Sequence, residues 1–195
     1  MDIPSMMIYV LVQTCAPGPS NLMALYAAAE AGMRGAKSYI LGSMTCYFLK
    51  LILCGSLNVV LATAIPQVIP YMKWVGAAYM IYLAVSLIIA GIRKEGNTTK
   101  KSNIATFWNG MLMQAVSVKG WILAVSVFSI YIIPFTTRPL DLILWGLLFF
   151  AIMGVETTLW AFCGDRVEKL YRNHKLAFNI CMAVPMVYTA IKSVI

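Results

Sequence analysis

The chain has 195 residues, of which 61% are hydrophobic and only 11% are charged. Soluble domains carry about 25% charged residues, so this composition indicates an integral membrane protein and excludes a large soluble catalytic domain. The formal net charge is +8. Because the basic residues lie in short connections between apolar stretches, they indicate membrane orientation and argue against nucleic-acid binding.

Six apolar stretches cover most of the chain: residues 6–29, 39–64, 74–92, 104–133, 140–164 and 176–195. Each is close to the ~20 residues that a helix needs to cross a bilayer. We therefore expect an all-α integral membrane protein with six transmembrane helices in one domain over residues 1–195. The first stretch has no basic residue before it and no convincing cleavage site, so we expect a retained helix and not a signal peptide.

The first apolar stretch is interrupted at residues 16–21, which read Ala16-Pro17-Gly18-Pro19-Ser20-Asn21. Proline removes a backbone donor and clashes with the preceding turn, so the helix must end here and restart. Broken backbone at membrane depth is tolerated only beside protein or water, as in a binding site or transport pathway. The helix that restarts after Pro19 can be capped by Ser20 or Asn21, and its N–H groups favour an anion.

Basic residues are concentrated in alternate connections. One side of the predicted membrane domain carries ten: Arg34, Lys37, Arg93, Lys94, Lys100, Lys101, Arg166, Lys169, Arg172 and Lys175. The other side carries Lys73 and Arg138, with Lys192 close to the C-terminus. The excess of basic residues marks the cytoplasmic side, so both termini are predicted to lie outside.

A basic linker at residues 93–103 separates a first half, 1–92, from a second half, 104–195, and each half has three apolar stretches. Three is an odd number, so equivalent halves would have opposite orientations, which predicts a 3+3 inverted repeat with broken first and fourth helices. The second interruption runs from Gln114 through Ser117 to Gly120. We expect the two breaks to lie side by side near the membrane midplane.

Three ionisable residues lie well inside apolar stretches: Lys50, Lys119 and Glu156. Each would cost several kcal/mol if it faced lipid without a partner. Lys119 lies at the second break, where it is expected either to bind a carboxylate together with the helix start at Asn21 or to neutralise helix carbonyls. Lys50 and Glu156 are expected to form a buried ion pair, with the alternative that Glu156 takes up a proton or a substrate ammonium.

Other polar and sulfur-containing residues suggest less. Tyr79 and Tyr82 lie three residues apart on one predicted helix face, where packing is the default role, although Tyr79 is kept as a candidate for the site. The five cysteines form no C-x-x-C pattern, so no metal site, disulfide or cofactor is expected. The chain also lacks the sequence motifs of intramembrane catalysis, so an enzyme is not expected and no catalytic residue is assigned.

These motifs resemble the lysine exporter (LysE/RhtB) family of small bacterial amino-acid exporters, over essentially the whole chain. The residues that carry the resemblance are 16–21, Gly32 with Arg34, Gly42, 76–79, Tyr82 with Leu83, and 114–119. Many members of the family have Asn-Pro-Lys where this chain has Ser117-Val118-Lys119. Within the family, the chain is most similar to the members that export cysteine and O-acetylserine.

The resemblance implies a multi-pass secondary transporter in the bacterial cytoplasmic membrane that exports cysteine, O-acetylserine or a related neutral amino acid, driven by the proton gradient. The residues expected to contact the substrate are Pro17, Gly18, Pro19, Ser20, Asn21, Tyr79, Gln114, Ser117 and Lys119. The expected partners are this small substrate and the lipid bilayer, and the sequence leaves open whether the chain forms a homo-oligomer. The alternatives are a transmembrane thiol-redox conduit, for which Cys15 is suitably placed, and, more remotely, an intramembrane enzyme.

Overall fold

The computed structural model describes residues 2–92 and 105–194, so the basic linker expected at residues 93–103 lies outside the described part. The described residues form helices and turns, without a β-strand. The helices are α1 (Ile3–Cys15), α2 (Pro19–Ser56), α3 (Asn58–Ile92), α4 (Phe107–Ala115), α5 (Val118–Ser126), a π-helix η1 (Val127–Ile132), α6 (Pro139–Arg166), α7 (Glu168–Asn173) and α8 (Lys175–Val194). The all-helical class predicted from the sequence is confirmed.

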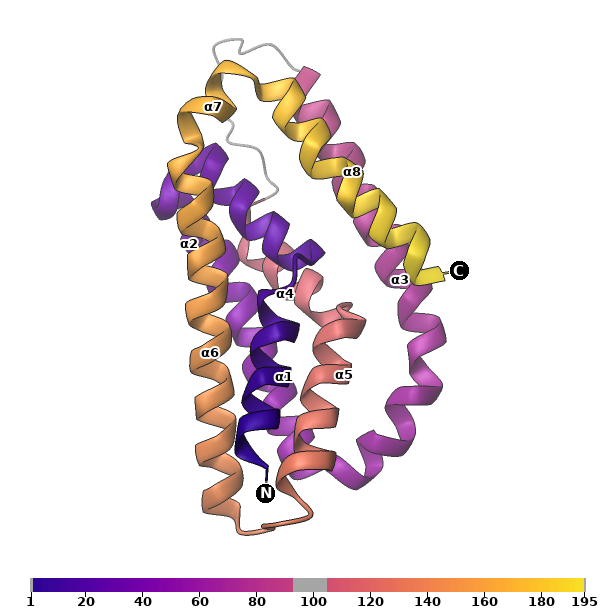
Figure 1. The fold of residues 1–195 in the computed structure, drawn as a ribbon. Coiled ribbons are helices and arrows are strands. Elements are labelled where there is room, and N and C mark those ends of the chain that lie inside the picture. The colour runs from indigo at the N-terminus through magenta and orange to yellow at the C-terminus, as the bar shows by residue number, and fades with distance from the viewer. Residues whose placement is uncertain (1, 93–104, 195) are drawn as a thin grey trace.

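The helices are arranged as a bundle with a long helix pair along one side. Helices α1, α2, α4, α5 and α6 gather in the bundle, whereas α3 and α8 pack against each other in antiparallel directions (Figure 1). One apolar core joins the first part of α2 to α3 and α8, and a second joins α1, the end of α2, α5, η1 and α6. The two helix breaks lie between these cores.

Three helices are long and apolar enough to cross a membrane: α2, the Ala64–Ile92 part of α3, and α6. Helices α4 and α5–η1 are bent by 61° at the second interruption. They form a fourth candidate if they are counted as one broken span. Many large apolar side chains on the outer surface are exposed, as lipid-facing residues are. The chain is therefore an integral membrane protein, whereas its division into six spans stays a prediction.

The connection predicted between the second and third apolar stretches is part of a helix and not a loop. Helix α3 begins at Asn58 and contains Pro66 and Pro70, which lie between the apolar stretches predicted at residues 39–64 and 74–92. Figure 1 shows that α3 curves through this region instead of forming a loop. Proline removes a hydrogen bond and bends a helix, so two prolines four residues apart account for the curve.

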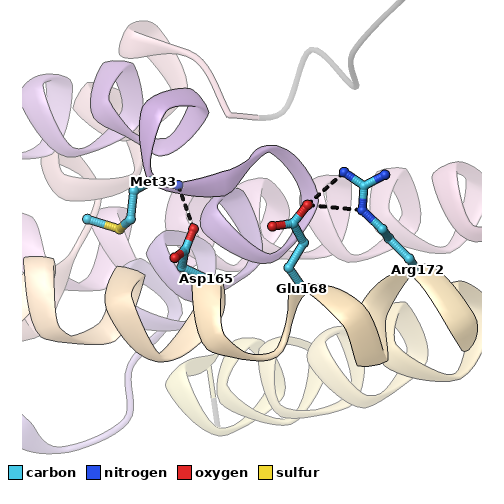
Figure 2. Close-up of polar contacts among 4 residues, drawn as sticks. All are labelled: Met33, Asp165, Glu168 and Arg172. Atoms are coloured by element: carbon cyan, nitrogen blue, oxygen red, sulfur yellow. Dashed lines mark hydrogen bonds and ion pairs between the residues drawn. The ribbon is translucent and has the colours of Figure 1, made fainter.

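The turn between the first and second stretches is a single kink inside α2. Gly32 has φ 67°, in the left-handed region that favours glycine. The carboxylate of Asp165, at the end of α6, accepts a hydrogen bond of 2.9 Å from the backbone N–H of Met33 (Figure 2). Asp165 therefore caps the part of α2 that follows the kink, and it ties this turn to α6.

Three glycines bring helix backbones into direct contact at one end of the bundle. A Cβ atom on Gly110 of α4 would overlap the backbone of Tyr39 in α2, and one on Gly42 of α2 would overlap the backbone of Phe107 in α4. A Cβ atom on Gly164 of α6 would overlap the backbone of Leu25 in α2. Small residues allow such close approach between membrane helices. The first part of α2 is therefore tightly closed against α6, and its second part against α4.

Candidate functional site

The first break separates α1 from α2 and is bridged by a side chain. Gly18, in an extended conformation, is the N-cap of α2, and Pro19 is its first residue. The amide of Asn21 donates 3.2 and 3.3 Å hydrogen bonds to the carbonyls of Thr14 and Ala16 at the end of α1. The expected capping by Ser20 or Asn21 is wrong, because Pro19 takes the first helical position and the Asn21 side chain turns back to α1.

The second break separates α4 from α5 and contains a buried lysine from α2. Ser117 caps α5 by accepting a 3.2 Å hydrogen bond from the N–H of Gly120. Lys50 is only 1% exposed, and its ammonium donates hydrogen bonds to the carbonyls of Gln114 and Ser117. The same ammonium lies 4.8 Å from the centre of the Trp121 ring. A positive charge thus neutralises the negative end of α4, and an aromatic face covers it.

Lys119 connects the two breaks. It follows the second break at the start of α5, and its Nζ donates a 3.0 Å hydrogen bond to the carbonyl of Ala16 at the first. A Cβ atom on Gly18 would lie 3.8 Å from this Nζ. The structure therefore brings residues 16–18 beside Lys119, as the inverted-repeat hypothesis requires, and the lysine has a helix carbonyl as a partner. Its ammonium has three donor hydrogens, so it can bind a further acceptor.

Glu156 lies on α6 close to Lys119. The carboxylate is 5% exposed, and Oε2 accepts a 3.4 Å hydrogen bond from the Thr157 hydroxyl. Oε1 is buried and has no hydrogen-bond partner among the described residues. Lys119 is the charged group that interacts with Glu156, and Asn21 and Trp160 lie beside the carboxylate. The site thus holds a buried acid with unused bonding capacity.

The structure gives Lys50 and Glu156 different neighbours. The sole ion pair among the residues described joins Arg172 and Glu168 on α7, at 2.6 Å (Figure 2). The expected Lys50–Glu156 contact is therefore absent from this conformation. The two residues were matched by their depth along the membrane normal, but Lys50 faces the end of α4 whereas Glu156 faces Lys119.

The remaining residues predicted to contact the substrate lie either at the breaks or on the surrounding helices. Gln114 is 2% exposed at the second break, and Ser20 is buried at the first, where its hydroxyl has no hydrogen-bond partner in the described part of the chain. Pro17 is exposed. Tyr79 donates to the carbonyl and side-chain oxygens of Asn109, so its contact is with α4.

Two aromatic residues at the breaks were not predicted from the sequence. The Tyr39 hydroxyl donates a 3.1 Å hydrogen bond to the carbonyl of Ser20, and the indole of Trp121 donates one of 2.9 Å to the carbonyl of Ala115. Trp121 satisfies a carbonyl at the C-terminal end of α4, where a membrane provides no water, whereas Tyr39 ties the second part of α2 to its first turn. Trp121 could have been found from its place after the second break, but Tyr39 is distant in sequence from the residue it contacts.

A cavity of about 340 Å³ opens beside Lys119. Its volume is within the range of small-molecule sites. Its lining comes from α1, α3, α5 and α8: Tyr9, Gln13, Lys73, Val118, Lys119, Ile122, Leu123 and Lys192. Within the described part of the chain, no group of His, Cys, Asp and Glu side chains could hold a metal ion.

The cysteines do not gather at the breaks. Cys15 is exposed at the end of α1, whereas Cys46 and Cys54 are buried in α2. Cys163 and Cys181 are exposed, and all five are free thiols. No observation in the described structure favours the thiol-redox alternative.

Comparison with known proteins gives one consistent result. The sequence model of a family described as "LysE type translocator" matches residues 11–195. A "Cysteine/O-acetylserine efflux protein" of Escherichia coli O1:K1 / APEC is 28% identical over 185 residues, which cover 94% of this chain and 93% of that protein. Proteins of the same name from Escherichia coli strain K12 and Shigella flexneri serotype 5b (strain 8401) are 27% identical with the same coverage. No solved structure matches the chain.

Proposed function

The chain belongs to the LysE-type translocator family, and on this premise we propose that it is a secondary transporter that exports a small neutral amino acid. A member of this family is a transporter and not an enzyme. The relatives named as cysteine and O-acetylserine efflux proteins support these two compounds as the first substrates to test. The proposed location is the bacterial cytoplasmic membrane, with both termini outside.

The proposed substrate site lies between the two breaks. The observation that carries the proposal is that Lys119 reaches the carbonyl of Ala16 beside a buried carboxylate, Glu156, whose Oε1 has no partner among the described residues. A neutral amino acid carries both an ammonium and a carboxylate. Lys119 would hold the substrate carboxylate, and Glu156 would hold the substrate ammonium, so each charge of the zwitterion would meet its opposite.

The same two residues suggest how export is coupled to protons. Glu156 can bind either the substrate ammonium or a proton, because one carboxylate cannot satisfy both at once. A carrier that releases the amino acid outside would return with a proton on Glu156 and release it inside. Alternating access would rock one half of the chain against the other about the two breaks, as a 3+3 arrangement would permit.

Counterflow of radiolabelled O-acetylserine or cysteine in proteoliposomes tests the site. We expect Lys119→Met to abolish exchange while folding persists, because methionine keeps most of the side-chain length but removes the charge. Lys119→Arg is not expected to restore exchange, because the planar guanidinium presents different donors in a confined site. Lys37→Met, at an exposed basic residue, is the matched control and should leave exchange unchanged. Parental exchange by well-folded Lys119→Met protein would refute the carboxylate site.

A further inference from the structure

The cavity beside Lys119 is lined by an unusual set of charges. Three of its lining residues are lysines, Lys73 from α3, Lys119 from α5 and Lys192 from α8, and none is acidic. Neither Lys73 nor Lys192 forms an ion pair with any residue described in the structure. Three ammonium groups around one low-dielectric hollow raise its positive potential and attract anions. A cationic ligand would be repelled for the same reason.

The exposure of these three lysines indicates at which of them the cavity opens to the surface. Lys119 is half-buried and bonds to the first break, whereas Lys73 is partly exposed and Lys192 is exposed. The cavity therefore connects the proposed substrate site with the surface that carries Lys73 and Lys192. The end of α8, which bears Lys192, lies beside α3 (Figure 1). The positive-inside rule assigns Lys73 and Lys192 to the outer half of the membrane, so the outside is the expected direction of the opening.

The packing of the other end of the bundle agrees with this direction. There the backbone contacts at Gly110 and Gly164 close α2 against α4 and α6. Lys37, two residues before Tyr39 in α2, and Lys169, in α7 just after α6, are close in the chain to these contacts, and the positive-inside rule assigns both to the cytoplasm. With this orientation, the backbone contacts at Gly110 and Gly164 lie on the cytoplasmic side of the breaks and close it.

We propose that this cavity is the exit vestibule of the transporter, where Lys73 and Lys192 receive the substrate carboxylate from Lys119. The proposal rests on the proposed function and extends it to substrate class. Amino acids with a neutral or acidic side chain should pass, whereas basic amino acids should be excluded by the three positive charges. Lys73 and Lys192 are therefore specificity-determining residues outside the midplane site.

The test is counterflow with substrate applied to the outer face, in proteoliposomes whose protein orientation has been determined by labelling. In the double variant Lys73→Gln/Lys192→Gln we expect the outer-face KM for O-acetylserine to rise about tenfold. The KM of the parent should also rise with salt, because ions screen the lysines, and that of the variant should rise much less. Lysine should compete poorly against the parent and better against the variant.

Lys37→Gln/Lys169→Gln is the matched control, because it removes two exposed basic charges from the opposite face. It should leave the outer-face KM unchanged. The proposal is overturned if the Lys73/Lys192 variant keeps the parental KM and salt dependence while the parent exchanges substrate, a result that leaves the midplane site intact. It is also overturned if the effect appears in vesicles with phosphatidylglycerol but not in purely zwitterionic ones, since the lysines would then bind lipid phosphate. If the parent exchanges no amino acid, the proposed function itself fails.

Discussion

The two lysines at the helix breaks are satisfied by carbonyls at helix ends. Lys119 binds the end of α1, and Lys50 binds the end of α4, so each break has a positive charge at its negative helix terminus. In the membrane an isolated ammonium would cost several kcal/mol, and these carbonyls reduce that cost without a carboxylate in contact. Glu156 is consequently left with Lys119 as a charged neighbour instead of a tight ion-pair partner.

This placement leads to a prediction for Glu156. Glu156→Gln removes the group that would alternate between proton and ammonium while preserving side-chain size, so a pH gradient should no longer drive efflux. Substrate binding should weaken by about tenfold, because a charged hydrogen bond is replaced by a neutral one. Efflux from loaded proteoliposomes, with and without a pH gradient, measures both effects. Glu168→Gln, at the carboxylate paired with Arg172 on α7, should behave as the parent. Undiminished gradient-driven efflux in Glu156→Gln would exclude this residue from coupling.

At the scale of elements, the broken helices were easier to predict than the turns between helices. Proline and glycine at residues 17–19 specify an interruption locally, so the first break could be located from the sequence. The kink at Gly32 depends on Asp165, which is 132 residues away in the chain and caps the helix after the kink. A contact between such distant residues leaves no local pattern, so the sequence indicated Gly32 only as part of a family motif.

The kink gives a second prediction. Gly32→Ala should lower the stability of the protein by about 1–2 kcal/mol, because a side chain disfavours the left-handed backbone at φ 67°. Thermal unfolding in detergent should show a lower midpoint. The matched control is Gly146→Ala in α6, where an added Cβ meets nothing within 4 Å and alanine favours the helix. A midpoint for Gly32→Ala equal to that of Gly146→Ala would show that the kink tolerates a side chain without strain.

For the whole molecule, the sequence was sufficient to predict an all-helical membrane protein whose two interruptions lie together. These features follow from long apolar stretches and from the few residue types that break a helix. The partner of Lys50 was not predictable, because hydropathy reports depth in the membrane but not the direction that a side chain faces around its helix. The cavity was missed for the same reason, since Lys73 and Lys192 appeared only as residues of outer connections.

The last prediction concerns the orientation of the whole molecule, on which the direction of the cavity depends. The excess of basic residues on one side predicts that Lys37 faces the cytoplasm and Thr137 the outside. Both are exposed, so each can be replaced by cysteine in a background without the five native cysteines. A membrane-impermeant thiol reagent should label Thr137→Cys in intact cells and Lys37→Cys only after permeabilisation. The reverse pattern would invert the topology, and the lysine-lined cavity would then open to the cytoplasm as an entrance.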